Sequence, residues 1–373
     1  TVEIQTRGHD DRGAYATANA SLWIDGKRIY EATGIGMRIV DDALAASTLA
    51  PAAVDALDLA DVRAHWATRL GRTNWPGEDL YMGLIERFVR TVMVTDPEAL
   101  AKIDGRSAIF VANHQVAVES LAFTFVATAL RNVPTMALAK VEHQQTWLGR
   151  LVDHCVAYPG IVDPQLLCFV DRRDPASFKQ VLAGVAEQMR SSSRALLVHV
   201  EGTRALSCRT PVETMSGTFL DLALSLGVPV VPVRFCGGLP VEPAPQRLDF
   251  PLHMGQQNIW IGRPIAAKDL AARPYAQRSQ VVVDAINALG PPQADAEPLP
   301  GDPRFDAQVQ RWQATHAVDE AHAVLHEVLA GRPQPSPGTR RLLEARSPSV
   351  MGSSDTTEDP WLVELWRRLH GHR

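Results

Sequence analysis

A histidine and a glutamate interrupt an apolar stretch of the chain with a spacing that suits acid–base chemistry. In the stretch from Phe110 to Phe125, His114 precedes Glu119 by five residues. A neutral imidazole takes a proton from a hydroxyl when its other nitrogen is held and its tautomer fixed, and a carboxylate does both. Residues 107–113 are predicted to be a strand and 118–130 a helix, so Glu119 lies one turn into the helix and can reach back to the ring. The spacing predicts a His–acid dyad that activates an alcohol nucleophile.

A second polar segment, HVEGTR at 199–204, follows another apolar strand, predicted at 195–202. Gly202 lets the backbone approach a ligand closely, and the Arg204 guanidinium can bind a phosphate through two nitrogens. Taken alone, residues 201–204 favour a tight turn with a surface ion pair, just as one histidine among twelve favours a structural role. The two segments together, each at the end of an apolar strand, indicate a functional site.

In combination, the NHxxxxE pattern at 113–119 and the EGTR pattern at 201–204 resemble the glycerolipid acyltransferase superfamily, which includes 1-acylglycerol-3-phosphate acyltransferases. Further blocks of that family have counterparts here in the same order: FVDR at 169–172, VPVVPV at 228–233, and Lys140 between the first two blocks. The resemblance covers roughly residues 75–270.

Two departures from the family pattern indicate a divergent branch. Glu119 stands where most of the family has aspartate, and its longer side chain still reaches the imidazole. Val200 replaces the proline before Glu201, and His199 stands where phenylalanine is usual. None of these changes removes a chemically required group.

The resemblance implies acyl transfer from a thioester to a glycerol hydroxyl, with His114 as general base and Glu119 orienting it. It also implies that Lys140, Arg172 and Arg204 hold the phosphate of the acceptor. Glu201, Gly202 and Thr203 complete the expected substrate-binding set, and backbone N–H groups around Gly202 are expected to stabilise the oxyanion. No metal or cofactor is expected.

The composition excludes several other classes of function. The 373 residues carry a net charge of −5 and no long basic run, which argues against nucleic acid as a partner. The four cysteines form no CxxC pair, so neither a zinc site nor a disulfide framework is indicated. No signal peptide or membrane-spanning run is visible, and the sequence predicts a cytoplasmic location.

Apolar strands alternating with helices predict an α/β domain whose mostly parallel or mixed central sheet is flanked by helices. Strands are expected at 107–113, 134–140, 155–159, 166–171, 195–202, 228–235 and 258–264, and helices at 118–130, 146–154, 176–192 and 217–227. Residues 77–94 are expected to form one amphipathic helix, whose contact with a membrane surface the sequence leaves open.

Four regions are expected along the chain. They are a β segment at 1–45, a linker with a short helix at 46–75, the acyltransferase domain at 76–290, and a C-terminal extension at 291–373. The extension is expected to contain a Pro-rich linker at 290–303, a helix at 306–331 and a largely disordered segment at 332–360.

The N-terminal segment also carries a shorter resemblance. SLWIDGKRIYEATGIGMRI, at 21–39, is similar to the closing strands of hot-dog-fold dehydratases in polyunsaturated fatty acid synthases. That resemblance implies an acyltransferase excised from the end of such a synthase, with the other synthase domains as partners. The acyl donor would then be an acyl carrier protein, with acyl-coenzyme A as the open alternative, and the acceptor lysophosphatidic acid. The alternative interpretation is that residues 1–45 form an edge of the acyltransferase domain.

Two alternative functions remain open on the sequence alone. Water in place of the glycerol hydroxyl would make the domain a thioesterase that releases free fatty acid. A domain that keeps the fold without the chemistry would be a docking module for a carrier protein, although such a module has no need of the His114–Glu119 pair.

Overall fold

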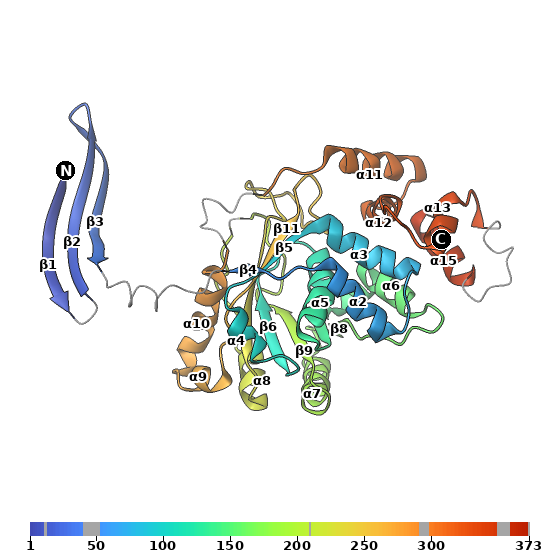
Figure 1. Ribbon diagram of the computed structural model, residues 1–373, viewed down its shortest axis with the longest axis horizontal. Helices are drawn as coiled ribbons and strands as arrows, with labels where there is room; N and C mark the ends of the chain where they lie inside the picture. The colour runs from blue at the N-terminus through green and yellow to red at the C-terminus, as the bar shows by residue number, and fades with distance from the viewer. Residues whose placement is uncertain (11–12, 40–52, 209, 291–297, 349–358, 372–373) are drawn as a thin grey trace. The chain divides into compact units, whose positions relative to one another are not determined.

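The computed structural model describes residues 1–10, 13–39, 53–208, 210–290, 298–348 and 359–371. The chain divides into two compact units, Thr1–Ala52 and Ala53–Arg373 (Figure 1). Parts of the predicted Pro-rich linker and of the predicted disordered segment, at 291–297 and 349–358, lie outside the described residues. Within the described ranges, no helix is long and apolar enough to cross a membrane.

The first unit is a three-stranded antiparallel sheet. β1 (Val2–Asp10), β2 (Gly13–Ile24) and β3 (Lys27–Ile39) pair in chain order. Asp25 and Gly26 connect β2 to β3 with φ angles of 50° and 76°, as a two-residue hairpin turn requires. The predicted strands and hairpin turn are confirmed, whereas a dehydratase origin for this segment stays a prediction.

The second unit is built on an eight-stranded sheet with the order β4-β5-β11-β10-β6-β9-β7-β8. Strands β6 to β10 run parallel to one another, and the antiparallel pairs are β10 with β11 and β4 with β5. This arrangement confirms the predicted α/β class with a mostly parallel, mixed sheet. The strands are β4 (Val54–Asp55), β5 (Val89–Val94), β6 (Ala108–Ala112), β7 (Thr135–Lys140), β8 (Leu167–Val170), β9 (Ala195–His199), β10 (Val230–Cys236) and β11 (Gln257–Ile261).

Helices cover both faces of this sheet because alternate residues of its central strands are apolar on both sides. Phe110 of β6 belongs to one buried cluster, and its neighbours Ile109 and Val111 belong to the other. The Phe110 cluster receives buried residues from α2 (Leu59–Leu70), α3 (Pro76–Phe88), α4 (Pro97–Ala101), α5 (Val118–Arg131) and α6 (Trp147–Val156). The opposite cluster receives them from α7 (Pro175–Ser191), α8 (Thr218–Leu226), α9 (Ala267–Ala271) and α10 (Tyr275–Asn287).

Two predicted elements are wrong. The helix expected over 77–94 ends at Phe88, and Val89–Val94 is strand β5, which pairs in parallel with β11. The strand expected at 155–159 is the end of helix α6 and a following turn. Both segments are short apolar runs, and periodicity alone does not distinguish a buried strand from a buried helix in such runs.

The C-terminal helices belong to the main core and are not an appended extension. The single helix expected at 306–331 is two helices that meet at Ala317, whose φ is 51°. Part of the segment expected to be disordered forms a helix with Leu342 buried. The helices are α11 (Pro303–His316), α12 (Glu320–Ala330), α13 (Pro337–Glu344) and α15 (Asp359–Leu369), and all add residues to the Phe110 cluster.

The prediction of a linker at 46–75 is wrong from Ala53 onward, because the chain there belongs to the compact second unit. Helix α2 is the short helix predicted in this region, but it is packed on the core. The indole of its Trp66 is buried, stacks on Phe125 at 4.3 Å between ring centroids, and donates a hydrogen bond to the Phe125 carbonyl.

Trp361 of α15 provides a test of this packing. Its indole donates a hydrogen bond to the carbonyl of His154 and stacks on that imidazole at 4.4 Å. We expect Trp361→Ala to lower the free energy of unfolding of the second unit by about 3–5 kcal/mol, because it empties a filled core position. Trp23→Ala, on the first unit and half-exposed, is the matched control and should change that value by less than about 0.5 kcal/mol. Denaturant titrations followed by helical circular dichroism measure both, and equal values would contradict the packing.

Candidate active site

Neighbouring parallel strands bring the two sequence motifs together. Strand β6 ends at Ala112, two residues before His114, and β9 ends at His199, two residues before the start of the 201–204 segment. Ala112 and His199 are partners in the register of these two strands. Open α/β sheets bind their ligands at the carboxyl ends of their parallel strands. The candidate site lies at this edge of the sheet.

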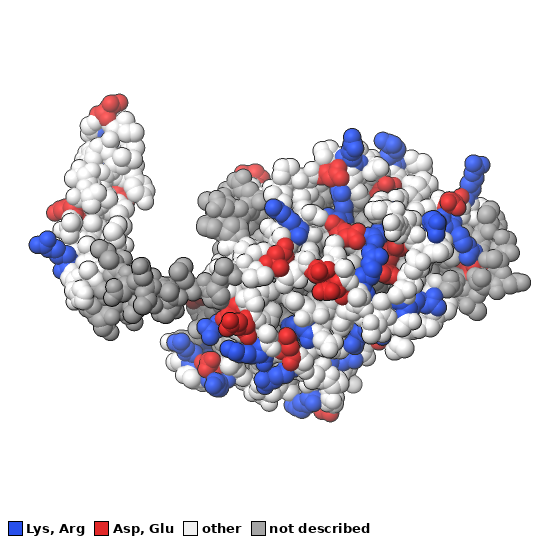
Figure 2. Space-filling model, viewed as in Figure 1, with Lys and Arg blue, Asp and Glu red and all other residues white. Residues whose placement is uncertain are grey.

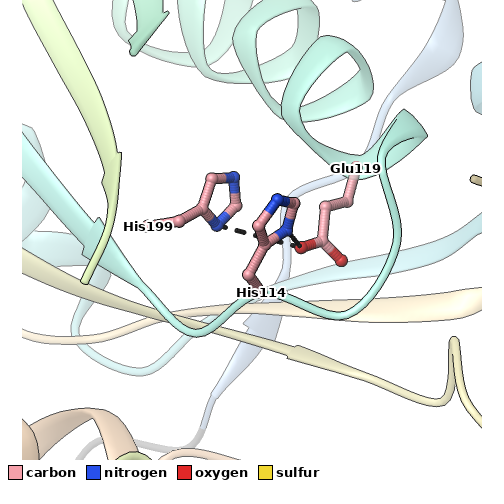
Figure 3. Close-up of side chains that lie close together, drawn as sticks. All are labelled: His114, Glu119 and His199. Atoms are coloured by element: carbon pink, nitrogen blue, oxygen red, sulfur yellow. Dashed lines mark hydrogen bonds and ion pairs between the residues drawn. The ribbon is translucent and has the colours of Figure 1, made fainter. Parts of the chain in front are cut away.

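His114 and Glu119 form the predicted hydrogen-bonded pair (Figure 3). Nδ1 of His114 lies 2.7 Å from Oε1 of Glu119, whose side chain is only 1% exposed. The same carboxylate accepts hydrogen bonds from the backbone N–H groups of Gln115 and Val116 and from Nε2 of Gln257. Four donors on one carboxylate favour its ionised form, which holds the imidazole proton on Nδ1. Nε2 of His114 is then the atom that can accept a proton.

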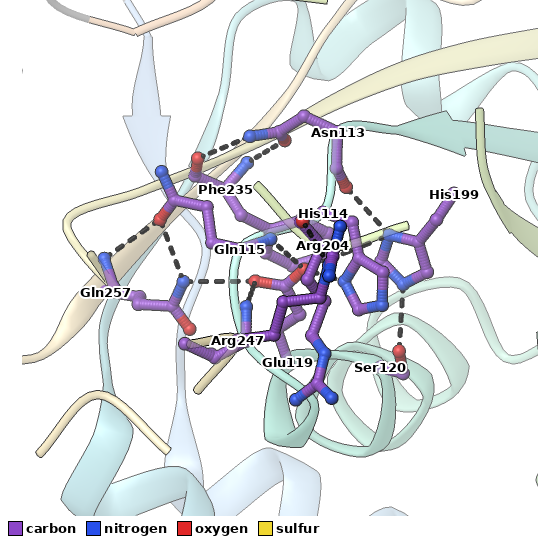
Figure 4. A network of polar contacts seen from close by, with 12 residues as sticks. Asn113, His114, Gln115, Glu119, Ser120, His199, Arg204, Phe235, Arg247 and Gln257 are labelled. Atoms are coloured by element: carbon purple, nitrogen blue, oxygen red, sulfur yellow. Dashed lines mark hydrogen bonds and ion pairs between the residues drawn. The ribbon is translucent and has the colours of Figure 1, made fainter. Parts of the chain in front are cut away.

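Further hydrogen bonds hold the loop that carries this pair (Figure 4). The Asn113 side chain donates to the carbonyl of Phe235 at 2.9 Å and accepts from its N–H at 2.7 Å, which fixes the loop to β10. The Gln115 side-chain oxygen accepts from the Gly238 N–H and from Gln257. Sequence reasoning missed these three side chains. Asn113 and Gln115 lie within the motif itself, but Gln257 comes from β11 and carries no local signal.

A second histidine lies against the first. The rings of His114 and His199 stack with centroids 3.7 Å apart and planes 16° apart. Burial, followed by the neighbouring His114, lowers the pKa of His199 to about 3. Burial, followed by the charges of Arg204, His143 and Lys140, holds the pKa of His114 well below its usual range. Both imidazoles are therefore neutral at physiological pH. In the sequence, His199 stands out only as a departure from the family pattern.

The ligand atoms of His114, Glu119 and His199 lie within 4.8 Å of one another, a spacing that could hold a metal ion. A metal requires lone pairs that converge on one point. The two imidazole rings are nearly parallel. Their in-plane lone pairs therefore lie in two stacked planes and do not converge on one ion. Nδ1 of each ring also has an oxygen partner at 2.7 Å. This geometry favours a hydrogen-bonded network over a metal site.

A cavity of about 230 Å³ opens on His114 and is rich in positive side chains. Arg172 donates a hydrogen bond to the Gly202 carbonyl, and Arg204 is ion-paired with Asp249. A Cβ on Gly202, whose φ is 68°, would lie 2.1 Å from a guanidinium nitrogen of Arg172, so glycine permits this approach. The predicted substrate-binding residues that line the cavity are Lys140, Arg172, Gly202, Thr203 and Arg204. The cavity is also lined by His143 and Arg247, which sequence analysis did not single out.

Glu201 lies apart from the rest of the predicted set. It lines a neighbouring cavity of about 480 Å³ that shares Arg172, His199 and Gly202 with the first. Burial raises the pKa of its carboxyl to about 7, and the nearby backbone N–H of His114 opposes this rise. Glu201 thus lies close to the loop that carries the histidine.

The expectation that backbone amides around Gly202 bind the oxyanion is wrong for Gly202 itself. Its N–H donates to the carbonyl of His199 at 3.1 Å, and the N–H of Ala205 donates to the carbonyl of His114 at 2.7 Å. The Gly202 N–H thus closes a turn within its own segment, and the Ala205 N–H holds that segment against the loop of His114.

The pKa of Glu119 predicts the pH dependence of any chemistry at His114. Burial raises this pKa to about 7, against the opposing effects of His199 and the hydrogen bonds from Gln257, Gln115 and Val116. Protonation of Glu119 removes the acceptor that holds the Nδ1 proton of His114. We therefore expect kcat/KM to rise with pH, with a midpoint at about 7, and to level off above it. A profile that stays flat through neutrality would contradict this assignment.

The segment that carries the site also matches a known family. Residues 91–236 match the family model described as Acyltransferase. The match includes His114, Glu119, Arg172 and Arg204, but Arg247 lies beyond it.

The solved structures similar to this chain include the 1-acyl-sn-glycerophosphate (LPA) acyltransferase PlsC from Thermotoga maritima. It has 19% sequence identity and a TM-score of 0.39, and the match covers 58% of this chain and 80% of that chain. No curated protein matches the chain.

Proposed function

We propose that the second unit is an acyltransferase that transfers a fatty acyl group from a thioester to the free hydroxyl of 1-acylglycerol-3-phosphate, producing phosphatidic acid. One observation carries this proposal: the hydrogen-bonded pair of His114 and Glu119 opens on a cavity lined by Lys140, Arg172, Arg204 and Arg247. A base for a hydroxyl thus lies beside a concentration of positive charge suited to a phosphate monoester.

In the proposed reaction, Nε2 of His114 takes the proton of the acceptor hydroxyl as its oxygen attacks the thioester carbonyl. The new C–O bond forms, the C–S bond breaks, and His114 passes the proton to the departing sulfur. Glu119, hydrogen-bonded to Nδ1 at 2.7 Å, stabilises the imidazolium that forms. Because burial lowers the pKa of His114, the ring starts the reaction unprotonated and returns its proton readily. The positive side chains hold the acceptor so that its hydroxyl lies within reach of the base.

The neighbouring cavity is suited to the acyl chain. Phe178, Val200, Met215 and Phe219 line it, and it adjoins the first cavity at Arg172, His199 and Gly202. A partly apolar cavity that adjoins a charged one beside His199 matches the acyl chain and the phosphorylated glycerol that meet during the transfer.

The donor, the compartment and the wider assembly are also part of this proposal. An acyl carrier protein of a polyunsaturated fatty acid synthase is the proposed donor, on the basis of Glu119 in place of aspartate and the sequence of the first unit. Four free cysteines suit the reducing cytoplasm. On the face that Figure 2 draws, positive and negative side chains are interspersed over the second unit. This face offers no extended basic surface for a nucleic acid.

The phosphate part of the proposal is tested with Arg172→Ala. Arg172 lines the cavity, and a lost charge-assisted hydrogen bond is worth about 1.5–3 kcal/mol. We expect KM for lysophosphatidic acid to rise about 10- to 100-fold, with kcat changed little because the phosphate is remote from the reacting carbonyl. The KM for a monoacylglycerol acceptor, which lacks the phosphate, should not change. Steady-state kinetics with both acceptors measure this.

Arg173→Ala is the matched control. Arg173 is the next residue, its side chain is 76% exposed, and it pairs with Glu142 and Asp171 on the surface. It does not line the cavity. If both substitutions affect the two acceptors equally, the phosphate is not bound at Arg172.

A further inference from the structure

Three separate segments of the chain supply positive side chains to the cavity beside His114. Lys140 ends β7, Arg204 follows β9, and Arg247 lies in the connection from β10 to β11. Figure 4 shows Arg204 and Arg247 close to His114. Cations on separate segments bind one ligand well only when neighbouring groups hold them in a fixed arrangement. Asp249, which the proposed function does not use, is placed to hold them.

The carboxylate of Asp249 connects the segment after β9 to the start of α6. Oδ1 accepts a hydrogen bond from Nη1 of Arg204, and Oδ2 accepts one from the indole N–H of Trp147 at 2.8 Å. Trp147 is buried and packs on Phe250 with ring centroids 4.5 Å apart. The backbone carbonyl of Asp249 also accepts from the N–H of Val118, the first residue of α5, at 3.0 Å. Asp249 is therefore anchored on both sides of Arg204.

The contacts of Arg204 occupy only one of its guanidinium nitrogens. Nη1 donates to Asp249 and to the carbonyl of Leu248, and no hydrogen bond to Nε or Nη2 is found within the described part of the chain. Nε and Nη2 form a fork with which an arginine can bind two oxygens of one phosphate. The backbone carbonyl of Arg204 in turn accepts from Nε of Arg247 at 3.1 Å. The two segments thus hold each other in place, and the fork is left for a ligand.

We propose that Asp249 is a positioning residue that fixes Arg204 for binding the phosphate monoester of the acceptor. Its carboxylate holds Nη1 at the wall of the cavity, so that the fork of Nε and Nη2 binds the phosphate oxygens. Asp249 acts through Arg204 and does not contact the phosphate, whose negative charge it would repel. The identity of the acceptor rests on the proposed function.

The competing interpretation is that Asp249 occupies Arg204 and must be displaced by the phosphate. The two interpretations predict opposite effects when the carboxylate charge is removed. Loss of a negative charge beside a positive cavity strengthens phosphate binding, so loss of a competitor raises the affinity. Loss of a positioning residue lowers it, against that effect of charge. Because the Asp249 side chain is 37% exposed, solvent screens its charge, and we expect the orientation of Arg204 to dominate.

The test measures the binding of lysophosphatidic acid and of a monoacylglycerol to the full chain by isothermal titration calorimetry. Asp249→Asn keeps the shape but replaces one acceptor oxygen with a donor group, which opposes either Arg204 or Trp147. We expect the dissociation constant for lysophosphatidic acid to rise about 3- to 10-fold, as for one weakened hydrogen bond. The constant for the monoacylglycerol should not change. In kinetics of phosphatidic acid formation, KM should rise by a similar factor while kcat changes less than about twofold.

Two further variants separate orientation from charge and from folding. Glu142→Gln is the matched control, because Glu142 pairs with Arg173 on the surface and does not line the cavity. It removes one negative charge and should leave the dissociation constant unchanged or slightly lower. Arg204→Lys replaces the fork with a single nitrogen. In that background Asp249→Asn should cause no further rise, because Asp249 acts through Arg204.

Phosphatidic acid formation by wild type distinguishes the inference from the proposed function. If wild type forms it and Asp249→Asn binds lysophosphatidic acid as well as wild type or better, the inference is wrong and the proposed function stands. Equal weakening for both ligands, or a rise that persists in the Arg204→Lys background, would also overturn the inference. Selective weakening for lysophosphatidic acid, with no phosphatidic acid from wild type, would support the inference and overturn the proposed reaction. A wild-type protein that binds no lysophosphatidic acid would contradict both.

Discussion

Replacing His114 with alanine is expected to lower kcat/KM for phosphatidic acid formation by about 100- to 10,000-fold, the usual contribution of a positioned general base. Nε2 of His114 is the atom assigned to the proton of the acceptor hydroxyl. Its neighbour His199 is stacked against it, but its Nε2 is hydrogen-bonded to Ser120 and cannot replace it at full rate. Thioester and lysophosphatidic acid kinetics measure the effect.

The effect on catalysis is separated from an effect on folding by two controls. The His114→Ala protein should unfold at a temperature close to that of wild type, because the ring is partly exposed in the cavity and fills no closed core position. His9→Ala, an exposed histidine in β1 of the first unit, should keep full activity. Wild-type turnover in a folded His114→Ala protein would leave the domain without the assigned base and favour a docking module.

Glu119→Gln is expected to have the second large effect. All four hydrogen bonds to this side chain are donated to it, and an amide replaces one acceptor oxygen with a donor. The NH₂ group of the glutamine would face at least one N–H donor, with which it cannot form a hydrogen bond. The neutral side chain would also no longer hold the proton on Nδ1 of His114. We expect a loss of about 100- to 10,000-fold in kcat, since the corresponding acid-to-amide change in catalytic triads costs about 10⁴.

Glu119→Asp is the matched control for that substitution. It keeps the charge and restores the residue usual in the resembling family, at the cost of a shorter reach to His114. Its kcat should lie between those of wild type and Glu119→Gln. Because burial raises the pKa of Glu119 to about 7, the rise of activity with pH should disappear in the glutamine variant. A glutamine variant with wild-type kcat would mean that Glu119 has only a structural role.

The local sequence pattern predicts most strands and helices of the central sheet. It does not predict strand β5 or the packing of the C-terminal helices on the core. Strands such as Ala108–Ala112 and Ala195–His199 are apolar runs between turn signals, and these were predicted correctly. Val89–Val94 was misread because it continues a helix without a break, and its identity as a strand depends on pairing with β11. The C-terminal helices looked separate because a polar, Pro-rich sequence precedes them, whereas buried Trp361 shows that they complete the core.

In the candidate site, too, the sequence predicts local contacts but not contacts between distant segments. The relation of His114 to Glu119 follows from five residues of sequence at a strand-to-helix connection. Gln257 and Arg247 come from distant segments, and only the folded sheet brings them to the site. The Ser120–His199 pair is also invisible in sequence, because its two members belong to different motifs and meet only through the pairing of β6 with β9.

Transfer of an acyl group to the hydroxyl of lysophosphatidic acid is tested by the fate of a labelled acyl thioester. The thioester is incubated with wild-type protein, with and without lysophosphatidic acid, and the lipid products are identified by mass spectrometry. We predict labelled phosphatidic acid when the acceptor is present, at a rate well above that of free fatty acid release. Labelled free fatty acid as the main product in both samples would contradict the claim and identify the domain as a thioesterase.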